Sequence, residues 1–140
     1  MNNLEKAKLL LSENTYTCVI CSNSDTLTSR ERGVSPLMKW LNEGKVLDEY
    51  SAADKVVGNG AAFLYILLKI KELHAEVISR PALDNLKAHG IPVTFSTLAE
   101  AIRNRDSTGF CPIETAVSGI TEPAAALEAI KNRLAEMKMN

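Results

Sequence analysis

The stretch from Ala75 to Ser96 constrains the fold of this chain more than any other. "AEVIS" is a short apolar strand, and "RPALDNLKAHG" is a helix with Pro81 in its first turn and Gly90 at its C′ position. "IPVTFS" then predicts a second strand. A helix between two strands of one sheet makes a right-handed crossover, which joins parallel strands. The stretch therefore predicts an α/β fold.

The remaining segments extend this pattern on both sides. "TYTCVIC", "SNSD" and "TLTSRERG" indicate a β-hairpin, which is antiparallel. The sequence also predicts helices over 4–11, 35–43, 51–74, 97–104, 111–119 and 121–139. We expect the second to open at Ser35–Pro36, and the third and fourth to begin with the capping boxes Ser51–Asp54 and Thr97–Glu100. Together these elements predict one domain, residues 1–140, a three-layer α/β/α sandwich with a mixed sheet.

Composition narrows the class of protein. Apolar residues make up 46% and charged residues 24%, typical of a globular domain. The formal net charge is -1 and aromatic residues are only 5%, so neither a basic surface nor a base-stacking platform favours nucleic acid. The apolar runs are too short to span a membrane, and no signal-peptide cleavage pattern is visible. We expect a cytoplasmic protein with neither a nucleic-acid nor a membrane partner.

Cys18 and Cys21 form a C-x-x-C pair within a strand-like run. Side chains three apart on a strand point to opposite faces, so the two sulfurs are badly placed to share a metal. We predict that both are small core residues.

The stretch "LHAEVISRPALDN" looks at first like half of a zinc deaminase signature, H-x-E with P-C-x-x-C. Only "VISR" separates Glu76 from Pro81, too little for the helix and strand that should lie between the two motifs. We interpret His74 as a helix end, like His89. "PALDN" has Ala82 and Asn85 where cysteines would stand, so the sequence predicts no metal and no other cofactor.

Four longer strings point to a known family: "GVSPLMKWL", "ADKVVGNGAAFL", "AEVISRPALDNLKAHGI" and "NRDSTGFCPIETAV". From about Thr17 to the last helix, the chain resembles an uncharacterised bacterial and archaeal domain family. The resemblance implies a cytidine-deaminase-like fold without the zinc ligands, and no established activity. A Lys is usual in that pattern where this chain has Asn59.

The first candidate ligand site is "ADKVVGNG". Gly58 and Gly60 let a ligand approach the backbone at a helix start, and Asp54, Lys55 and Asn59 stand beside them. A helix N-terminus favours an anion such as phosphate. The alternative is that the glycines permit close packing on the sheet.

The second candidate is "NRDSTGFCPIE". Arg103 and Arg105 suit a phosphate or carboxylate, and Asp106 suits a ribose hydroxyl. Cys111 at a helix start is a candidate nucleophile, and Glu114 one turn on is a candidate general base. No His stands nearby to activate the thiol. We expect both candidate stretches at the C-terminal edge of the sheet.

The function is thus unknown from sequence, with three hypotheses. The leading one is a zinc-free, deaminase-like domain that binds a nucleotide-related or other anionic small molecule. The second is an enzyme that uses Cys111 or Glu114 on such a ligand. The third is a regulatory or protein-interaction module without a ligand. A homo-oligomer is compatible with all three.

Overall fold

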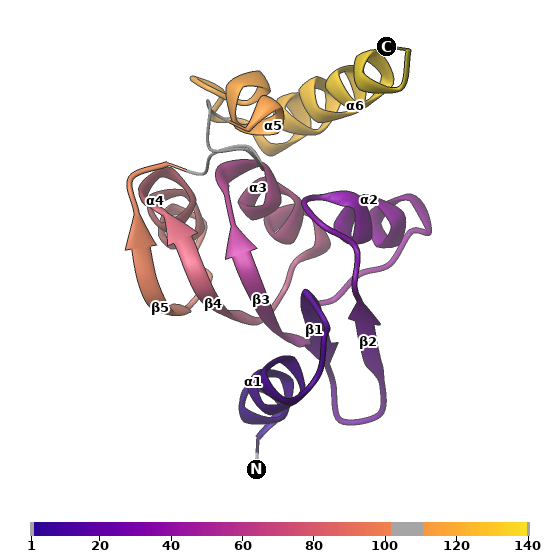
Figure 1. Cartoon of the computed structure of the whole chain (residues 1–140), viewed down its shortest axis with the longest axis vertical. Helices are drawn as coiled ribbons and strands as arrows, with labels where there is room; N and C mark the ends of the chain where they lie inside the picture. Colours follow the sequence, from indigo (N-terminus) through magenta and orange to yellow (C-terminus); the bar gives the residue numbers. More distant parts are fainter. Residues whose placement is uncertain (1, 102–110, 140) are drawn as a thin grey trace.

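The architecture is a mixed β-sheet with helices on both faces (Figure 1). A computed structural model describes residues 2–101 and 111–139. The elements are α1 (Asn3–Glu13), β1 (Cys18–Cys21), β2 (Thr26–Ser29), α2 (Ser35–Asn42), β3 (Ser51–Val57), α3 (Asn59–Leu68), β4 (Glu72–Ser79), α4 (Arg80–Ala88), β5 (Val93–Ala99), α5 (Pro112–Ala116) and α6 (Pro123–Met139). None of the described helices is both long and apolar enough to cross a membrane.

The sheet has the strand order β2-β1-β3-β4-β5. β1 is antiparallel to both β2 and β3, whereas β3, β4 and β5 are parallel. α3 and α4 make the two crossovers between the parallel strands. The predicted hairpin, the predicted strand–helix–strand unit and the α/β class with a mixed sheet are therefore confirmed.

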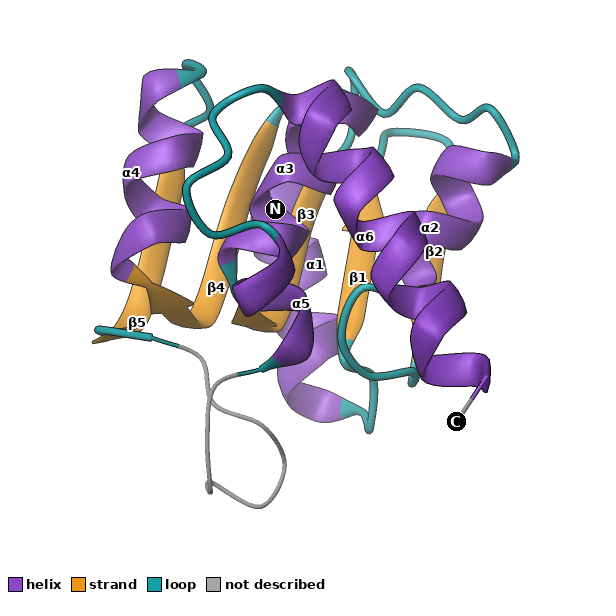
Figure 2. Cartoon of the chain, turned by 90° about the horizontal axis from the view of Figure 1, so that it is seen from above, coloured by secondary structure: helices purple, strands orange, loops and turns teal. Residues whose placement is uncertain are grey.

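The two faces of the sheet carry separate apolar clusters. α1 covers one face through a small cluster that joins Ala7 and Leu11 to Val19, Cys21 and Ala53. The larger cluster lies on the other face. Figure 2 shows α2, α3 and α4 over that face of the sheet. Cys18 belongs to the larger cluster and Cys21 to the smaller one, and both are free, buried thiols. The two cysteines are core residues on opposite faces, as predicted.

α3 is buried on nearly every side. Its residues from Gly60 to Tyr65 are all buried, as is Leu68. One side of the helix meets the sheet, and α6 packs against it with Ala126 and Ile130 in the shared core. A helix covered all round is apolar all round, which explains the run "AAFLYILL".

The predicted helix over 51–74 is wrong at its start. Ser51–Val57 is the central strand β3, between β1 and β4. A strand buried on both faces has no polar alternation, so "SAADKVV" does not show the usual strand pattern. The Ser51 hydroxyl, expected to cap a helix, donates instead to the Glu72 carboxylate at 2.6 Å.

The same prediction is wrong at its end. α3 stops at Leu68 because Lys69 adopts a left-handed conformation, with φ 64° and ψ 35°. His74 therefore lies within β4 and not at a helix end. His89 is the C-cap of α4, and Gly90 follows with φ 76°, so the predicted end of that helix is confirmed.

The predicted helix that begins at Thr97 is also wrong where the structure describes it. β5 continues through Thr97 to Ala99, in register with Val77 and Ser79 of β4. Pairing with the neighbouring strand replaces the capping box expected from Thr97 and Glu100. The later part of that predicted helix, 102–104, lies outside the described residues.

Candidate functional site

The N-termini of α3 and α4 meet at one edge of the sheet. α3 begins at Asn59, two residues after β3 ends, and α4 begins at Arg80, directly after β4. Because β3 and β4 are parallel neighbours, their carboxyl ends place both helix starts at the same edge. A side-chain hydrogen bond also links the two helices: Asn85 Nδ2, in the second turn of α4, donates to Asn59 Oδ1 at 2.9 Å.

A carboxylate from α5 occupies the N-terminus of α3. Glu114 Oε1 accepts a hydrogen bond from the Asn59 N–H at 2.5 Å, and Oε2 accepts one from the Gly60 N–H at 2.9 Å. The N-cap residue, Gly58, has no side chain to bond these amides. Glu114 thus caps α3 from a distant helix, with a negative charge where the helix dipole favours one.

Gly58 and Gly60 make this contact sterically possible. A Cβ on Gly58 would lie 2.7 Å from the Glu114 carboxyl carbon. A Cβ on Gly60 would lie 2.5 Å from Ile113 Cγ2. Of the two roles proposed for these glycines, close packing is what the structure shows, but the partner is α5 and not the sheet.

The structure brings only some of the predicted site residues together. Gly58, Asn59 and Glu114 come together at the start of α3. Cys111 is the half-buried N-cap of α5, and no hydrogen bond among the described residues joins it to Glu114. Lys55 lies within β3, where its N–H donates to the Thr17 carbonyl at 3.0 Å, so it does not belong to the helix start. Arg103, Arg105 and Asp106 lie outside the described residues.

Asp54 belongs to a buried network and not to a helix start, contrary to prediction. Tyr65 Oη donates to Asp54 Oδ2 at 2.7 Å, and Cys18 Sγ lies 3.2 Å from the same hydroxyl. Asp54 Oδ1 accepts from the Val56 N–H at 3.2 Å. Burial raises the pKa of Asp54 to about 7, although the bond from Tyr65 opposes the shift. Burial likewise raises the pKa of Tyr65 and that of Cys18.

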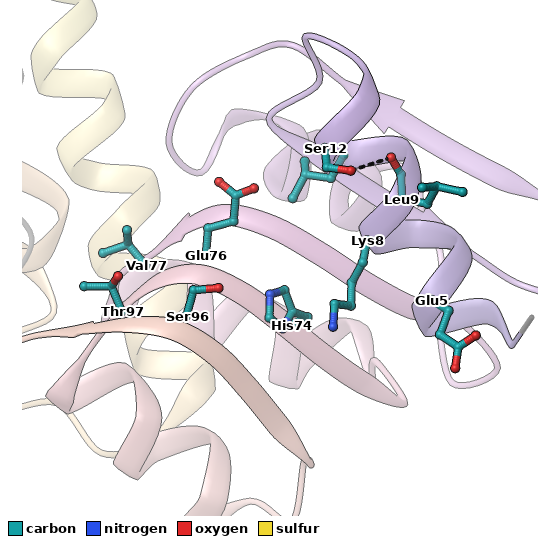
Figure 3. A pocket seen from close by; sticks show the side chains of 10 residues that line it. Glu5, Lys8, Leu9, Ser12, His74, Glu76, Val77, Ser96 and Thr97 are labelled. Atoms are coloured by element: carbon teal, nitrogen blue, oxygen red, sulfur yellow. Dashed lines mark hydrogen bonds between the residues drawn. The ribbon is translucent and has the colours of Figure 1, made fainter.

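A separate groove of about 650 Å³ lies between α1 and the β4–β5 side of the sheet (Figure 3). His74, Glu76 and Ser96 line its floor, and Lys8 extends over it from α1. His74 Nδ1 is 2.7 Å from Thr94 Oγ1, and burial lowers the pKa of the imidazole. The groove contains none of the predicted site residues and is open to solvent. We place the candidate site at the start of α3 because the charged and polar contacts converge there.

Metal-binding side chains do not gather in the part of the chain that the structure describes. No three His, Cys, Asp or Glu side chains lie close enough there to hold an ion. At the two positions compared with deaminase cysteines, Ala82 is buried and Asn85 bonds Asn59. Among the described residues, the polar groups at this edge include the Asn59 and Asn85 amides, the Glu114 carboxylate and the Ser79 hydroxyl that caps α4.

Fold and site together define the class of protein. It is an α/β domain whose candidate site is a helix N-terminus at the carboxyl edge of a mixed sheet, capped by a carboxylate of the same chain. The chain belongs to the family described as TM1506, a domain of unknown function (DUF1893), whose model matches residues 6–134.

One solved relative supports the same fold. A crystal structure of a DUF1893 family protein, TM1506, from Thermotoga maritima superposes with a TM-score of 0.84. The alignment covers 97% of this chain and 91% of that one, at 24% sequence identity. No curated protein matches the chain.

The sequence does not predict the roles of three residues in these contacts. Tyr65 is hidden in an apolar helix, although a lone hydroxyl in "AAFLYILL" signals a buried polar partner. The sequence indicates Asn85 only as the replacement of a deaminase cysteine, yet its side chain bonds Asn59. Ile113, which packs on Gly60, carries no local signal at all.

The first prediction concerns the dependence of stability on pH. The pKa of Asp54 is about 7 in the folded protein against an ordinary value of 3.8, so folding favours the protonated acid. Protonated Asp54 contributes fully to the free energy of unfolding below about pH 4, and this contribution is lost as the pH rises through 7. The total loss over that pH range is on the order of 4 kcal/mol. We expect Asp54→Asn, measured by urea unfolding, to gain stability relative to the wild type from pH 5 to 8. If the free energies of unfolding of the two proteins changed in parallel with pH, Asp54 would not have a raised pKa in the folded protein.

The second prediction concerns the contact between Gly58 and Glu114. Gly58→Ala places a methyl group on the Glu114 carboxylate, so it should cost about 1–3 kcal/mol through the displaced charge-assisted bonds. In a Glu114→Ala background the carboxylate that the added methyl group would meet is absent. Gly58→Ala should then lower the free energy of unfolding much less than it does in the wild type.

A double-mutant cycle measures the coupling, which we expect to be about 1–2 kcal/mol. Thr115→Ala, on the exposed side of α5, is the matched control and should be additive with Gly58→Ala. Additive costs for the Gly58 and Glu114 substitutions would show that the contact does not form in solution.

Proposed function

We propose that this chain is a cytidine-deaminase-like domain that binds a nucleotide-related or other anionic small molecule without a metal. The proposed binding site is the start of α3, next to the start of α4. The cytoplasmic location expected from the sequence is part of the same proposal.

The arrangement of α3 and α4 supports the proposed fold. The sequence resemblance implies a fold in which two helix starts converge at one sheet edge. Here the starts of α3 and α4 lie at the carboxyl ends of β3 and β4, and a hydrogen bond joins Asn59 at the start of α3 to Asn85 in the second turn of α4. Asn59 and Asn85 offer amide groups, which suit hydrogen bonding to a ribose or base better than metal ligation.

The single observation that carries the proposed function is the carboxylate on the α3 N-terminus. Two backbone N–H groups, from Asn59 and Gly60, both bond one anionic group. A phosphate or carboxylate of a ligand can accept the same two bonds, as anions do at helix N-termini. The absence of a Cβ at Gly58 leaves room for either group.

Ligand binding in this scheme is an exchange of anions. Glu114 holds the site in the ligand-free protein, and a ligand phosphate replaces it. The cost of releasing Glu114 reduces the apparent affinity, since only the open fraction of molecules binds. Arg105 and Asp106, on the segment before α5, remain predicted contributors to the site.

The two alternatives differ in the role of Glu114. An enzyme with Cys111 as nucleophile and Glu114 as base first has to free Glu114 from the two α3 amides. A module without a ligand uses Glu114 only as a permanent cap. Each oxygen of the Glu114 carboxylate has a hydrogen-bond partner on α3, as a permanent cap requires. This observation makes the ligand-free module the second candidate function.

The third prediction separates these candidates by ligand-induced stabilisation. We expect AMP, ADP and ribose 5-phosphate to raise the melting temperature, whereas adenosine, which has no phosphate, should not. A ligand at about 100 times its Kd stabilises the native state by about 2.7 kcal/mol. Glu114→Ala removes the competitor, so it should show larger ligand-induced shifts than the wild type.

Glu128→Ala, on the exposed face of α6, removes the same charge and is the matched control. It should respond to each ligand as the wild type does. A panel that shifts neither the wild type nor Glu114→Ala would rule out the anion-binding function in favour of the module.

A further inference from the structure

β5 forms one outer edge of the sheet, and its middle is exposed. The strand order places β5 at one side and β2 at the other (Figure 1). Thr94, Phe95, Ser96 and Thr97 are all exposed, although they lie within a seven-residue strand. An outer strand has a row of backbone N–H and C=O groups on its free side, which can pair with another strand.

The usual protections of a sheet edge are missing from β5. Proteins protect edges with charged side chains, with prolines inside the strand or with very short strands. No charged residue occurs from Ile91 to Ala99, and Pro92 precedes the strand. β2, in contrast, has only four residues and is flanked by Asp25 and Arg30. Within residues 2–101 and 111–139, the β2 edge has such protection and the β5 strand has none of its own.

Phe95 adds an apolar group at the unprotected edge. It pairs in register with Ala75, which belongs to the cluster beneath α3 and α4, so Phe95 points to the α4 side of the sheet. Its side chain is nevertheless 40% exposed. A strand added beside β5 would bring new side chains against this ring and cover more of it.

We propose that β5 pairs antiparallel with β5 of a second copy of this chain. A two-fold axis passes near the middle of the strand and joins the two sheets into one. The backbone bonds supply the pairing, and the two Phe95 rings lie on the same face of the joined sheet.

We infer that the partner is a second copy of this chain because β5 carries no charged side chain. A two-fold axis brings each central residue close to its own equivalent, so any charged residue there would meet a like charge. The stretch from Ile91 to Ala99 meets this condition along its whole length. A charged peptide would find no opposite charge on this strand to select it.

The fourth prediction uses one substitution on both edges. Thr97→Lys places two like charges near the proposed axis, while Thr28→Lys makes the same change at an exposed position of β2. Sedimentation equilibrium should show a monomer–dimer equilibrium for the wild type. We expect Thr97→Lys to raise the dimer Kd by about tenfold or more, and Thr28→Lys to leave it unchanged. Far-UV circular dichroism checks that both variants fold, and Ser96→Lys replaces Thr97→Lys if that variant does not.

A cross-link locates the pairing directly. Ser96→Cys in a Cys111→Ser background should form an intermolecular disulfide under mild oxidation, because paired central residues have Cα separations that a disulfide spans. A wild type that stays monomeric at every concentration tested would overturn the proposal. So would a dimer that Thr97→Lys does not weaken, or a Ser96→Cys protein that does not cross-link.

Discussion

The hydrogen bonds from the start of α3 to the Glu114 carboxylate connect the parts of this molecule. They tie α5, which follows the sheet in sequence, to a helix start between the first two parallel strands. They also account for the two glycines at the start of α3, since a side chain at Gly58 or Gly60 would collide with α5. With α6 packed on α3, the C-terminal helices are held against the side of α3 that the sheet does not cover.

A second polar network connects the same helix, α3, to the face of the sheet on which it packs. Tyr65 on α3 reaches Asp54 on β3 and Cys18 on β1, all within an otherwise apolar core. Buried polar groups cost free energy unless they are paired, and each oxygen of Asp54 has a partner here. The cost that remains is electrostatic and appears as the raised pKa of Asp54. α3 is thereby positioned at its start by Glu114 and at mid-length by Asp54, which sets the geometry of the candidate site.

The sequence predicts those parts of the fold that depend on local rules. Pro81 and Gly90 bound α4 correctly, and the C-x-x-C spacing places Cys18 and Cys21 on opposite faces. β3 is missed because a doubly buried strand and a buried helix have similar composition. The end of α3 is missed because Lys69, and not a glycine, takes the left-handed conformation.

The candidate site is harder to predict because its central contact is not local. The sequence predicts Glu114 as a general base for its neighbour Cys111, whereas its carboxylate bonds two backbone amides of α3. Its partners are the backbone amides of Asn59 and Gly60, more than fifty positions earlier in the chain. No periodicity or spacing rule links such residues. The prediction for Asp54 is wrong for a related reason: Tyr65 comes within hydrogen-bonding distance of Asp54 only because β3 and α3 are separate elements, and the sequence predicts one continuous helix there.

The central claim is that the amides of Asn59 and Gly60 are an anion site that Glu114 shares with a ligand. The most direct test is an NMR titration that follows these two amide signals and the Glu114 carboxyl carbon as ADP is added. We expect all three signals to shift saturably with one midpoint, because the incoming phosphate takes the two bonds that Glu114 releases. Saturable shifts confined to other residues, or none in these three signals, would contradict the account.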